Sequence, residues 1–464
     1  MKTKLLSIAL FAFTLTAFAQ DGEEDSTKVN KQKGEPFEGM DLSWLNGGDR
    51  RPTPTLAGKY FTPDVMLDMN YTHSYNNPND NTVVGSTALA RNNEVQVAAA
   101  FIGGTFQYGQ ARACLQLMFG TNSTVIPRDD YSSYKGQYRL QDVYRNLGNA
   151  NAGYHFKVWH GINVDAGMFT SYIGLNSYFQ AENWDYQASY TSDNTPWFFN
   201  GVRVQIHPTA HLKIEPWIIN GWQSYGMFNK QPGVGGNITY IPNENIKMLS
   251  NDYWGADAAG MPGRHRFHTD NSLLIKYLDR KKSKGISKMA FSLTLDAGFE
   301  KGDGVNGFKD GGASNPAQYF TSAMFYNRMW FAKNKYAWTF GGGVIDNPGR
   351  YLVLYPTGQA SPLPNPSNPT TTEGQFPYNT SAGSVFKAWD ASTGFDWMPN
   401  THVLFRVEYV YRYSTTPYFA GAGGVTSPDG YVSTPFGPGT ANPNWTPDLV
   451  KSESRIIFAV LFRL

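Results

Sequence analysis

The most constraining feature of the chain is a period-two pattern that runs from about residue 64 to the C-terminus. In segment after segment, apolar side chains occupy every second position, and polar or small side chains occupy the positions between them. One such segment places its apolar residues at Val403, Phe405, Val407, Tyr409 and Tyr411. Because successive side chains of a β-strand point to opposite faces, each segment predicts a strand with one apolar and one polar face.

The connections between these predicted strands alternate between long and short. Those after the odd-numbered strands are mostly long, such as residues 75–91, 172–196, 223–263, 346–383 and 416–451. Turns of a few residues follow the even-numbered strands. A β-barrel in a membrane with both chain ends on one side requires this asymmetry, whereas a sandwich or a propeller does not.

The pattern therefore predicts an all-β fold, a transmembrane antiparallel up-and-down β-barrel of about 14 strands with short periplasmic turns and long extracellular loops. The count stays open between about 12 and about 16, partly because the fourth strand is ambiguous. Leu140, Val143, Tyr144 and Leu147 follow helical spacing. A short helix before a strand at residues 150–156 is as compatible with this spacing as one long strand.

The composition agrees with a barrel. Aromatic residues make up 15% of the chain and charged residues only 16%, against a usual charged share of about 25%. A lipid-facing band without charge and aromatic girdles at its edges shift the composition in this direction. The longest apolar run beyond the N-terminal region is Ile456–Phe462, which is far shorter than the roughly 20 residues of a membrane-spanning helix.

The N-terminus has the features of an export signal. Lys2 and Lys4 precede an apolar stretch, and Ala17-Phe18-Ala19 is a small-x-small cleavage site. This order predicts a signal peptide over residues 1–19, which is removed after export from the cytoplasm. We expect residues 20–38 to be a polar spacer, residues 39–63 to be an N-terminal periplasmic or plug segment, and residues 64–464 to be the transmembrane β-barrel.

Several short motifs resemble one known family. They are Asp41-Leu42-Ser43-Trp44-Leu45-Asn46-Gly47, Leu140-Gln141-Asp142, Asp165-Ala166-Gly167-Met168-Phe169, Phe199-Asn200-Gly201-Val202-Arg203 and Ile219-Asn220-Gly221-Trp222. Together they resemble the OmpL-like β-barrel porins, especially those of Bacteroidota, over residues 41–464. The resemblance implies an outer-membrane porin and brings no established binding residues with it.

In a barrel whose apolar side chains face lipid, the alternate side chains face the lumen. A charged side chain at the lipid midplane costs about 2–4 kcal/mol for Arg or Lys, so charged residues near mid-strand must point inward. The predicted pore-lining residues are Arg203, Lys213, Glu215, Asp270, Lys276, Asp296, Arg328, Arg406, Glu408 and Arg412. Arg203, Lys213, Arg328, Arg406 and Arg412 predict a mild preference for anions. Salt-bridge networks that stiffen the wall are an equally good reading of these residues.

The sequence gives no reason to expect catalysis, a cofactor or a metal. His268, Asp270 and Ser272 share a strand face, but alternate residues lie about 6.5–7 Å apart, too far for a nucleophile and its base. No phosphate loop, zinc motif or nucleophile elbow is present. The single cysteine, Cys114, excludes an internal disulfide and should face the lumen, and a net charge of +2 does not suggest nucleic-acid binding.

Large aromatic residues recur near the predicted strand ends. They are Trp197, Phe198, Trp217, Trp222, Trp330, Trp338, Trp389 and Trp397. Interfacial girdles explain this placement, because an indole suits the boundary between headgroups and hydrocarbon. A sugar-binding slide is the alternative interpretation.

The implied function is that of an outer-membrane channel for passive or weakly selective diffusion of small hydrophilic solutes or ions. The partners expected are outer-membrane lipid and those solutes, with no nucleic acid, and the oligomeric state stays open. The alternative is a binding or scaffold barrel, in which the long connections at residues 223–263 and 415–451 engage a partner or a surface ligand.

Overall fold

The structure is a computed structural model that describes residues 34–47, 54–127, 130, 132, 135–258, 260–280, 283–309, 317–348, 386–431 and 447–464. The predicted signal peptide and most of the predicted polar spacer lie outside the described residues.

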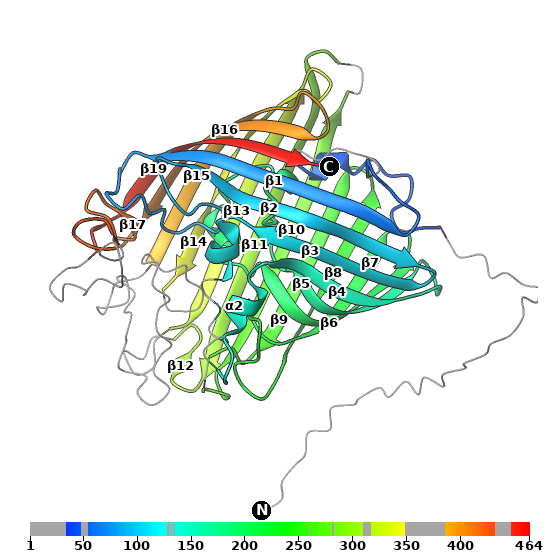
Figure 1. The fold of residues 1–464 in the computed structure, drawn as a ribbon, viewed down its shortest axis with the longest axis horizontal. Coiled ribbons are helices and arrows are strands. Elements are labelled where there is room, and N and C mark those ends of the chain that lie inside the picture. The colour runs from blue at the N-terminus through cyan, green and yellow to red at the C-terminus, as the bar shows by residue number, and fades with distance from the viewer. Residues whose placement is uncertain are drawn as a thin grey trace, which may run out of the picture.

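Sixteen long antiparallel strands form one sheet that closes on itself, which confirms the predicted barrel (Figure 1). The first strand, β1, pairs with β2 on one side and with the last strand, β19, on the other. The strands are β1 (Phe61–Ser74), β2 (Val95–Tyr108), β3 (Ala111–Phe119), β4 (Leu147–Phe156), β5 (Ile162–Thr170), β6 (Phe198–Thr209), β7 (Leu212–Ile219), β8 (Gly233–Asn243), β9 (Ile246–Gly255), β10 (His265–Asp279), β11 (Ile286–Gly302), β13 (Tyr319–Phe331), β14 (Tyr336–Asn347), β15 (Phe386–Trp397), β16 (Val403–Ser414) and β19 (Ser452–Arg463).

Short elements in the connections complete the fold. They are η1 (Ser43–Leu45), α1 (Asn122–Val125), α2 (Leu140–Tyr144), η4 (Gln180–Glu182), α3 (Tyr190–Asp193), β12 (Val305–Asn306), β17 (Phe419–Ala420) and β18 (Leu449–Val450). In the part of the chain that the structure describes, no helix is long and apolar enough to cross a membrane.

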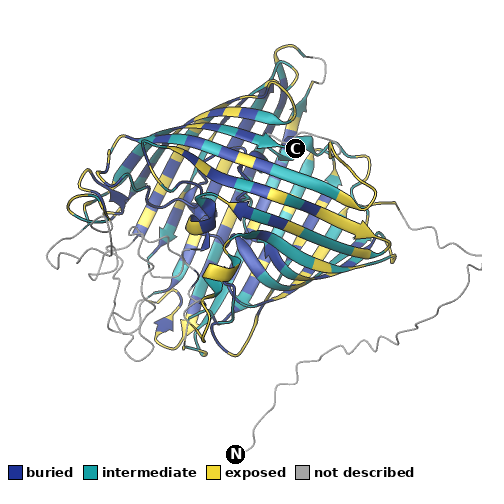
Figure 2. Cartoon of the chain, in the orientation of Figure 1, coloured by how far each residue is buried: buried dark blue, intermediate teal, exposed yellow. Residues whose placement is uncertain are grey.

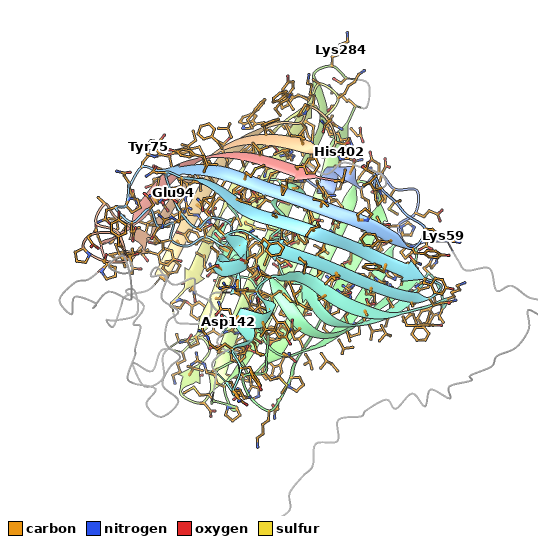
Figure 3. All side chains as sticks on the ribbon, viewed as in Figure 1. Lys59, Tyr75, Glu94, Asp142, Lys284 and His402 are labelled. Carbon is orange, nitrogen blue, oxygen red and sulfur yellow. The ribbon has the colours of Figure 1, made fainter. Side chains whose placement is uncertain are left out.

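The two ends of the barrel differ as the sequence predicts. The start of β1, the end of β19 and all the short turns lie at one end, here called the turn end, where Lys59, Lys284 and His402 are found (Figure 3). The described residues of the long connections lie at the opposite end, here called the loop end, which carries Tyr75 and Glu94 (Figure 3).

Exposure alternates along the strands, so that bands of buried and exposed residues cross the ribbon (Figure 2). On β16, Arg406 and Glu408 are each 1% exposed, whereas Val407 between them is 43% exposed. The apolar set of side chains therefore faces outward, and the charged set faces the interior. A lipid environment enforces this division, because only apolar side chains are stable against hydrocarbon.

We expect an arginine on the outward face to destabilise the barrel strongly at mid-strand. Val407→Arg places a charge in the middle of β16, where the cost is about 2–4 kcal/mol. Ala111→Arg is the matched control, because it lies at the turn-end edge of β3, where the cost falls to about 0–1 kcal/mol. Urea titration of folding into lipid bilayers measures both, and equal losses would contradict the assigned membrane-facing surface.

The connection predicted at residues 223–263 is wrong, because it contains the hairpin of β8 and β9. Val234, Ile238 and Tyr240 do alternate on the outward face of β8, but glycine and asparagine between them disguise the strand. These two strands raise the count to sixteen, within the predicted range. They also remove residues 223–263 as a single partner-binding loop.

Of the two alternatives left open for the fourth strand, the structure has the short helix followed by a strand: α2 precedes β4, which begins at Leu147 and not at residue 150. The alternation between the two faces is interrupted within β2. A β-bulge shifts the register between β1 and β2 at Met69, so Val97 points outward but Ala99 and Phe101 are buried inside.

The girdle prediction holds for only part of the aromatic set. Trp338, Trp389 and Trp397 are each about two-fifths exposed on the outward face, as interfacial residues should be. The other five residues are buried in the interior, with exposures of 8% or less, and they are Trp197, Phe198, Trp217, Trp222 and Trp330. Trp217 and Trp330 pack against Tyr172 and Trp184 of the connection between β5 and β6.

Candidate functional site: the barrel lumen

The connection between β5 and β6, residues 171–197, enters the barrel and is here called the inner loop. Most of its residues are buried. Phe179 packs edge-on against Phe101 of β2, with ring centroids 4.6 Å apart, and Trp184 packs against Trp330 of β13, with centroids 5.8 Å apart. Because these two contacts lie on different sides of the wall, the inner loop crosses the lumen.

Inward carboxylates hold the backbone of the inner loop. Glu408 on β16 accepts hydrogen bonds from the amides of Tyr186 and Gln187, at 2.6 and 2.8 Å. Asp390 on β15 accepts one from the amide of Tyr190 at 2.8 Å and one from the Ser189 hydroxyl at 3.0 Å. These bonds satisfy backbone donors that a loop in water would leave to solvent.

Inward arginines bind the carbonyl groups of the same loop. Arg328 on β13 and Arg406 on β16 share the carboxylate of Asp396, each at 2.7 Å. Arg328 also donates to the carbonyl of Trp184 at 3.2 Å, and Arg406 donates to that of Asn183 at 3.1 Å. The two guanidinium groups therefore share one carboxylate, while their remaining donors fix the loop.

Arg412 joins two loop-end connections to the wall. It is completely buried and lies 2.5 Å from the carboxylate of Asp193. It also donates to the carbonyl of Ala188 in the inner loop and to that of Gly85 in the β1–β2 connection. Its guanidinium lies 4.5 Å from the ring centre of Tyr190. This single side chain thus ties both connections to β16.

The N-terminal segment, Gly34–Gly47, meets the inner loop from the turn end. Trp44 is 1% exposed, and its indole donates to the carbonyl of Glu244 at 2.8 Å. The carbonyl of Trp44 accepts from the indole of Trp184 at 3.1 Å. Gly47 lies so close to the inner loop that an added Cβ would fall 1.9 Å from the carbonyl oxygen of Asn183. Only glycine fits there.

An ion pair also joins the N-terminal segment to β11. Asp41 accepts a hydrogen bond from the Ser43 hydroxyl at 2.6 Å and lies 3.3 Å from Nζ of Lys288. Burial alone would raise the pKa of Asp41, but the hydroxyl and the ammonium lower it to about 2. The carboxylate therefore stays charged at neutral pH, and protonation weakens this contact only in strong acid.

We expect Trp44→Ala to release the N-terminal segment. Loss of a buried tryptophan costs about 3–5 kcal/mol, which is large for a segment held by a few contacts. Limited proteolysis of the refolded barrel should then cleave within residues 34–47, where the wild type is protected. Phe37→Ala is the control, because Phe37 is only half-buried at the turn-end rim. Equal protection of all three proteins would contradict the anchoring role of Trp44.

Three further predicted residues are buried in the wall away from open water. Asp270 accepts from the side-chain amide of Asn251 at 2.8 Å, and Asp296 lies 2.6 Å from Nε2 of His268. Lys276 donates to Asp279 at 3.0 Å. The rejected hydrolase trio is not assembled, because the hydroxyl of Ser272 pairs with Thr294 at 2.8 Å.

The wall from β2 to β9 has a different character, because its inward charges do not balance. The predicted residues Arg203, Lys213 and Glu215 lie here, and Lys213 pairs with Glu215 at 2.9 Å. Over these strands the inward cations are Arg112, Arg203, Lys213 and Lys247, and the inward carboxylates are Asp165 and Glu215. We call these four cations the basic wall.

Two cavities adjoin the basic wall. One of about 630 Å³ is lined by Arg112 and Arg203 and reaches the turn end. Cys114 also lines it, which agrees with its predicted lumenal position. The other, of about 170 Å³, is lined by Lys247 and by Asn176, Glu182 and Asp185 of the inner loop. The side chains on the opposite side that hold the inner loop line neither cavity; they are Arg328, Arg406, Glu408 and Arg412.

Sequence reasoning missed several of these residues. Arg112 is not among the predicted pore-lining residues, and Lys247 lies in the segment predicted as a long connection. Asp165 alternates with Asn163 on the polar face of β5, a signal that the strand pattern contains. Nothing in the sequence around Asp193 or Arg412 indicates that these two residues form an ion pair.

In the residues that the structure describes, no three His, Cys, Asp or Glu side chains lie close enough together to hold a metal ion. A family model described as "Putative beta-barrel porin-2, OmpL-like" matches residues 61–441. No curated protein matches the chain.

Solved structures of several outer-membrane proteins are similar in shape. An anion-selective porin from Comamonas acidovorans has 10% identity and a TM-score of 0.45, covering 87% of this chain and 99% of that one. The outer membrane channel DcaP of Acinetobacter baumannii has 10% identity and a TM-score of 0.45, covering 87% and 97%. OprD from Pseudomonas aeruginosa has 10% identity and a TM-score of 0.40, covering 90% and 97%. Similarity at this level says nothing about solutes.

Proposed function

The chain belongs to the OmpL-like family of outer-membrane β-barrel porins, and from this premise we propose that it is a narrow diffusion channel for small hydrophilic solutes with a preference for anions. A sixteen-stranded barrel is wide enough to leave an aqueous channel when its interior is empty. Here the inner loop and the N-terminal segment occupy much of the interior. The solute path in this proposal runs between the inner loop and the basic wall.

The unbalanced charge of the basic wall is the observation that carries the preference for anions. On the opposite side, the inward cations Arg328, Arg406 and Arg412 are equal in number to the inward carboxylates Asp390, Asp396 and Glu408, and these arginines hold the inner loop. Along β2–β9 the wall carries four inward cations and two inward carboxylates, and the larger cavity is lined by Arg112 and Arg203 with Glu35 as the one carboxylate among the described residues. An excess of positive charge beside a narrow path attracts anions and repels cations. The predicted role of Arg203 and Lys213 is kept in this proposal, and that of Arg328, Arg406 and Arg412 becomes anchoring.

Planar bilayers with a potassium chloride gradient test the proposal. The reversal potential of the refolded protein should show chloride to be more permeant than potassium. Arg203→Gln combined with Lys213→Gln should shift it toward potassium. Lys387→Gln is the control, because Lys387 is exposed at the loop end and pairs with Asp346 outside the lumen. A cation-selective wild type contradicts the anion preference, and a protein without conductance contradicts the channel.

The proposal includes no enzymatic role and places the barrel in the outer membrane, with the turn end toward the periplasm. Delivery there by a cleaved signal peptide over residues 1–19 is part of the same proposal. N-terminal sequencing of the protein isolated from outer membranes tests it, and a mature chain that begins at Gln20 is expected.

A further inference from the structure

The larger cavity has the size of a binding site for a small solute. Its volume of about 630 Å³ falls within the range of about 300–1,000 Å³ that is usual for small-molecule sites. It is bounded by β1–β6 and by the first residues of the N-terminal segment. Glu35, at the turn end, is the one carboxylate among the described residues that line it.

Two arginines of the barrel wall, Arg112 on β3 and Arg203 on β6, line this cavity. Nε of Arg203 lies 3.0 Å from Oδ2 of Asp165, and Nε of Arg112 lies 3.3 Å from Oδ1 of the same carboxylate. Asp165 is 1% exposed and does not line the cavity, whereas both arginines do. Two guanidinium groups therefore share one buried carboxylate and leave one positive charge uncompensated at the cavity surface.

Aromatic rings hold Arg203 in place. Its guanidinium carbon lies 4.5 Å from the ring centre of Phe169 and 5.7 Å from that of Trp217. Stacking of this kind restricts the guanidinium group but does not use its N–H donors, which point outward in the guanidinium plane. In the described part of the chain, no hydrogen-bond acceptor meets the terminal nitrogens of Arg203 or Arg112.

The neighbouring carboxylate, Glu215, is already paired with another cation, Lys213. Glu215 accepts hydrogen bonds from Lys213 at 2.9 Å, Gln205 at 2.7 Å and the indole of Trp217 at 2.9 Å. Three donors occupy its two oxygens, and it does not line the cavity. The two arginines thus keep donors and charge available for a ligand.

We propose that Arg112 and Arg203 form a binding subsite for the carboxylate or phosphate group of a small hydroxylated solute that passes through the barrel. A planar guanidinium matches the two oxygens of a carboxylate or phosphate, and charged hydrogen bonds of this kind are the strong ones. Side-chain amides of Gln107, Gln110 and Asn151 line the same cavity and suit the hydroxyl groups of such a solute. A sugar acid or a sugar phosphate has this chemistry.

This inference rests on the proposed channel function, and the experiment separates the two. Single channels in planar bilayers are exposed, from the turn end, to gluconate, glucose 6-phosphate or uncharged glucose. Saturable interruption of the ion current is expected with gluconate, with glucose 6-phosphate or with both, and the two acids distinguish a carboxylate site from a phosphate site. Glucose should not interrupt the current at the same concentration.

Variants identify the residues. Arg203→Gln and Arg112→Gln should each raise the half-blocking concentration about tenfold, the effect of losing a charged hydrogen bond. Arg203→Lys keeps the charge but removes the fork, so it should weaken the block nearly as much, whereas a purely electrostatic effect predicts almost wild-type block. Lys157→Gln is the control, because Lys157 is an exposed cation on the β4–β5 turn outside the cavity.

The possible results distinguish failure of the channel function from failure of the subsite. A protein that forms no channels contradicts the proposed function. Channels that keep their preference for chloride but are not blocked by either acid contradict the subsite alone. Block by glucose at the same concentration, or unchanged block in Arg203→Gln, also overturns the subsite.

Discussion

Removal of the inner loop should raise the single-channel conductance severalfold. The variant replaces residues 175–194 with two glycines and leaves the ends of β5 and β6 untouched. Conductance follows the cross-section of the water-filled path, and the inner loop crosses the lumen from Phe101 on β2 to Trp330 on β13. An emptied barrel of sixteen strands has the bore of an open porin.

The geometry allows this deletion without strain on the barrel. The amide of Ser171 donates to the carbonyl of Trp197 at 2.9 Å, so the two ends of the inner loop already lie side by side. Gly174 and Thr195 are also neighbours, because a Cβ added at Gly174 would fall 2.7 Å from the Thr195 hydroxyl. The strand pairings that close the barrel do not involve the loop. The freed anchors, such as Glu408, become hydrated rather than buried and unpaired.

The conductance gain should come with a weaker preference for anions, since the basic wall then faces a wider path. Liposome swelling with sugars of increasing size should show a higher exclusion limit. Trimming the mostly exposed β11–β13 loop over residues 303–309 is the control, and it should leave both measurements unchanged. If the loop-less barrel conducts like the wild type, the inner loop does not set the bore.

The fold could be predicted because lipid imposes a rule on every strand. A side chain that faces lipid, such as Val407, must be apolar, and its charged neighbours Arg406 and Glu408 must point inward. The sequence therefore shows a period-two pattern wherever a strand crosses the membrane. The rule fails where the backbone geometry changes, and the bulge near Met69 reverses the face of Phe101. It also fails where a strand is rich in glycine, as in β8, because glycine has no side chain to show the alternation.

The filling of the lumen could not be predicted in the same way. Inside the barrel no solvent rule fixes which residues are apolar, and the contacts join positions far apart in the chain. Arg412 meets Asp193 across 219 residues, and Trp184 meets Trp44 across 140. The pattern identified Arg412 as inward, but it could not tell a residue that faces water from one that holds a loop. Buried tryptophans such as Trp330 were assigned to the membrane interface for the same reason.

Arg412→Gln should leave the barrel folded but loosen the inner loop. The substitution removes the partner of Asp193, whose carboxylate is also buried, and an unpaired buried charge costs about 3–5 kcal/mol. Asp193 keeps hydrogen bonds from Thr87 and Gln187, which stabilise it only in part. The carbonyls of Gly85 and Ala188 lose a donor at the same time. Single-channel recordings should therefore show frequent steps to higher conductance, which the wild type lacks.

A double-mutant cycle isolates the ion pair from general damage. Asp193→Asn removes the stranded charge, so Arg412→Gln combined with Asp193→Asn should show fewer open steps than Arg412→Gln alone. Arg412→Lys should rescue little, because an ammonium on a flexible stem cannot reach Asp193 and two carbonyls together as the planar guanidinium does. Heat-modified migration on gels checks that each barrel is folded. If the two substitutions act additively, Arg412 holds the loops through its carbonyl contacts and packing on Tyr190, and the charge pair contributes nothing of its own.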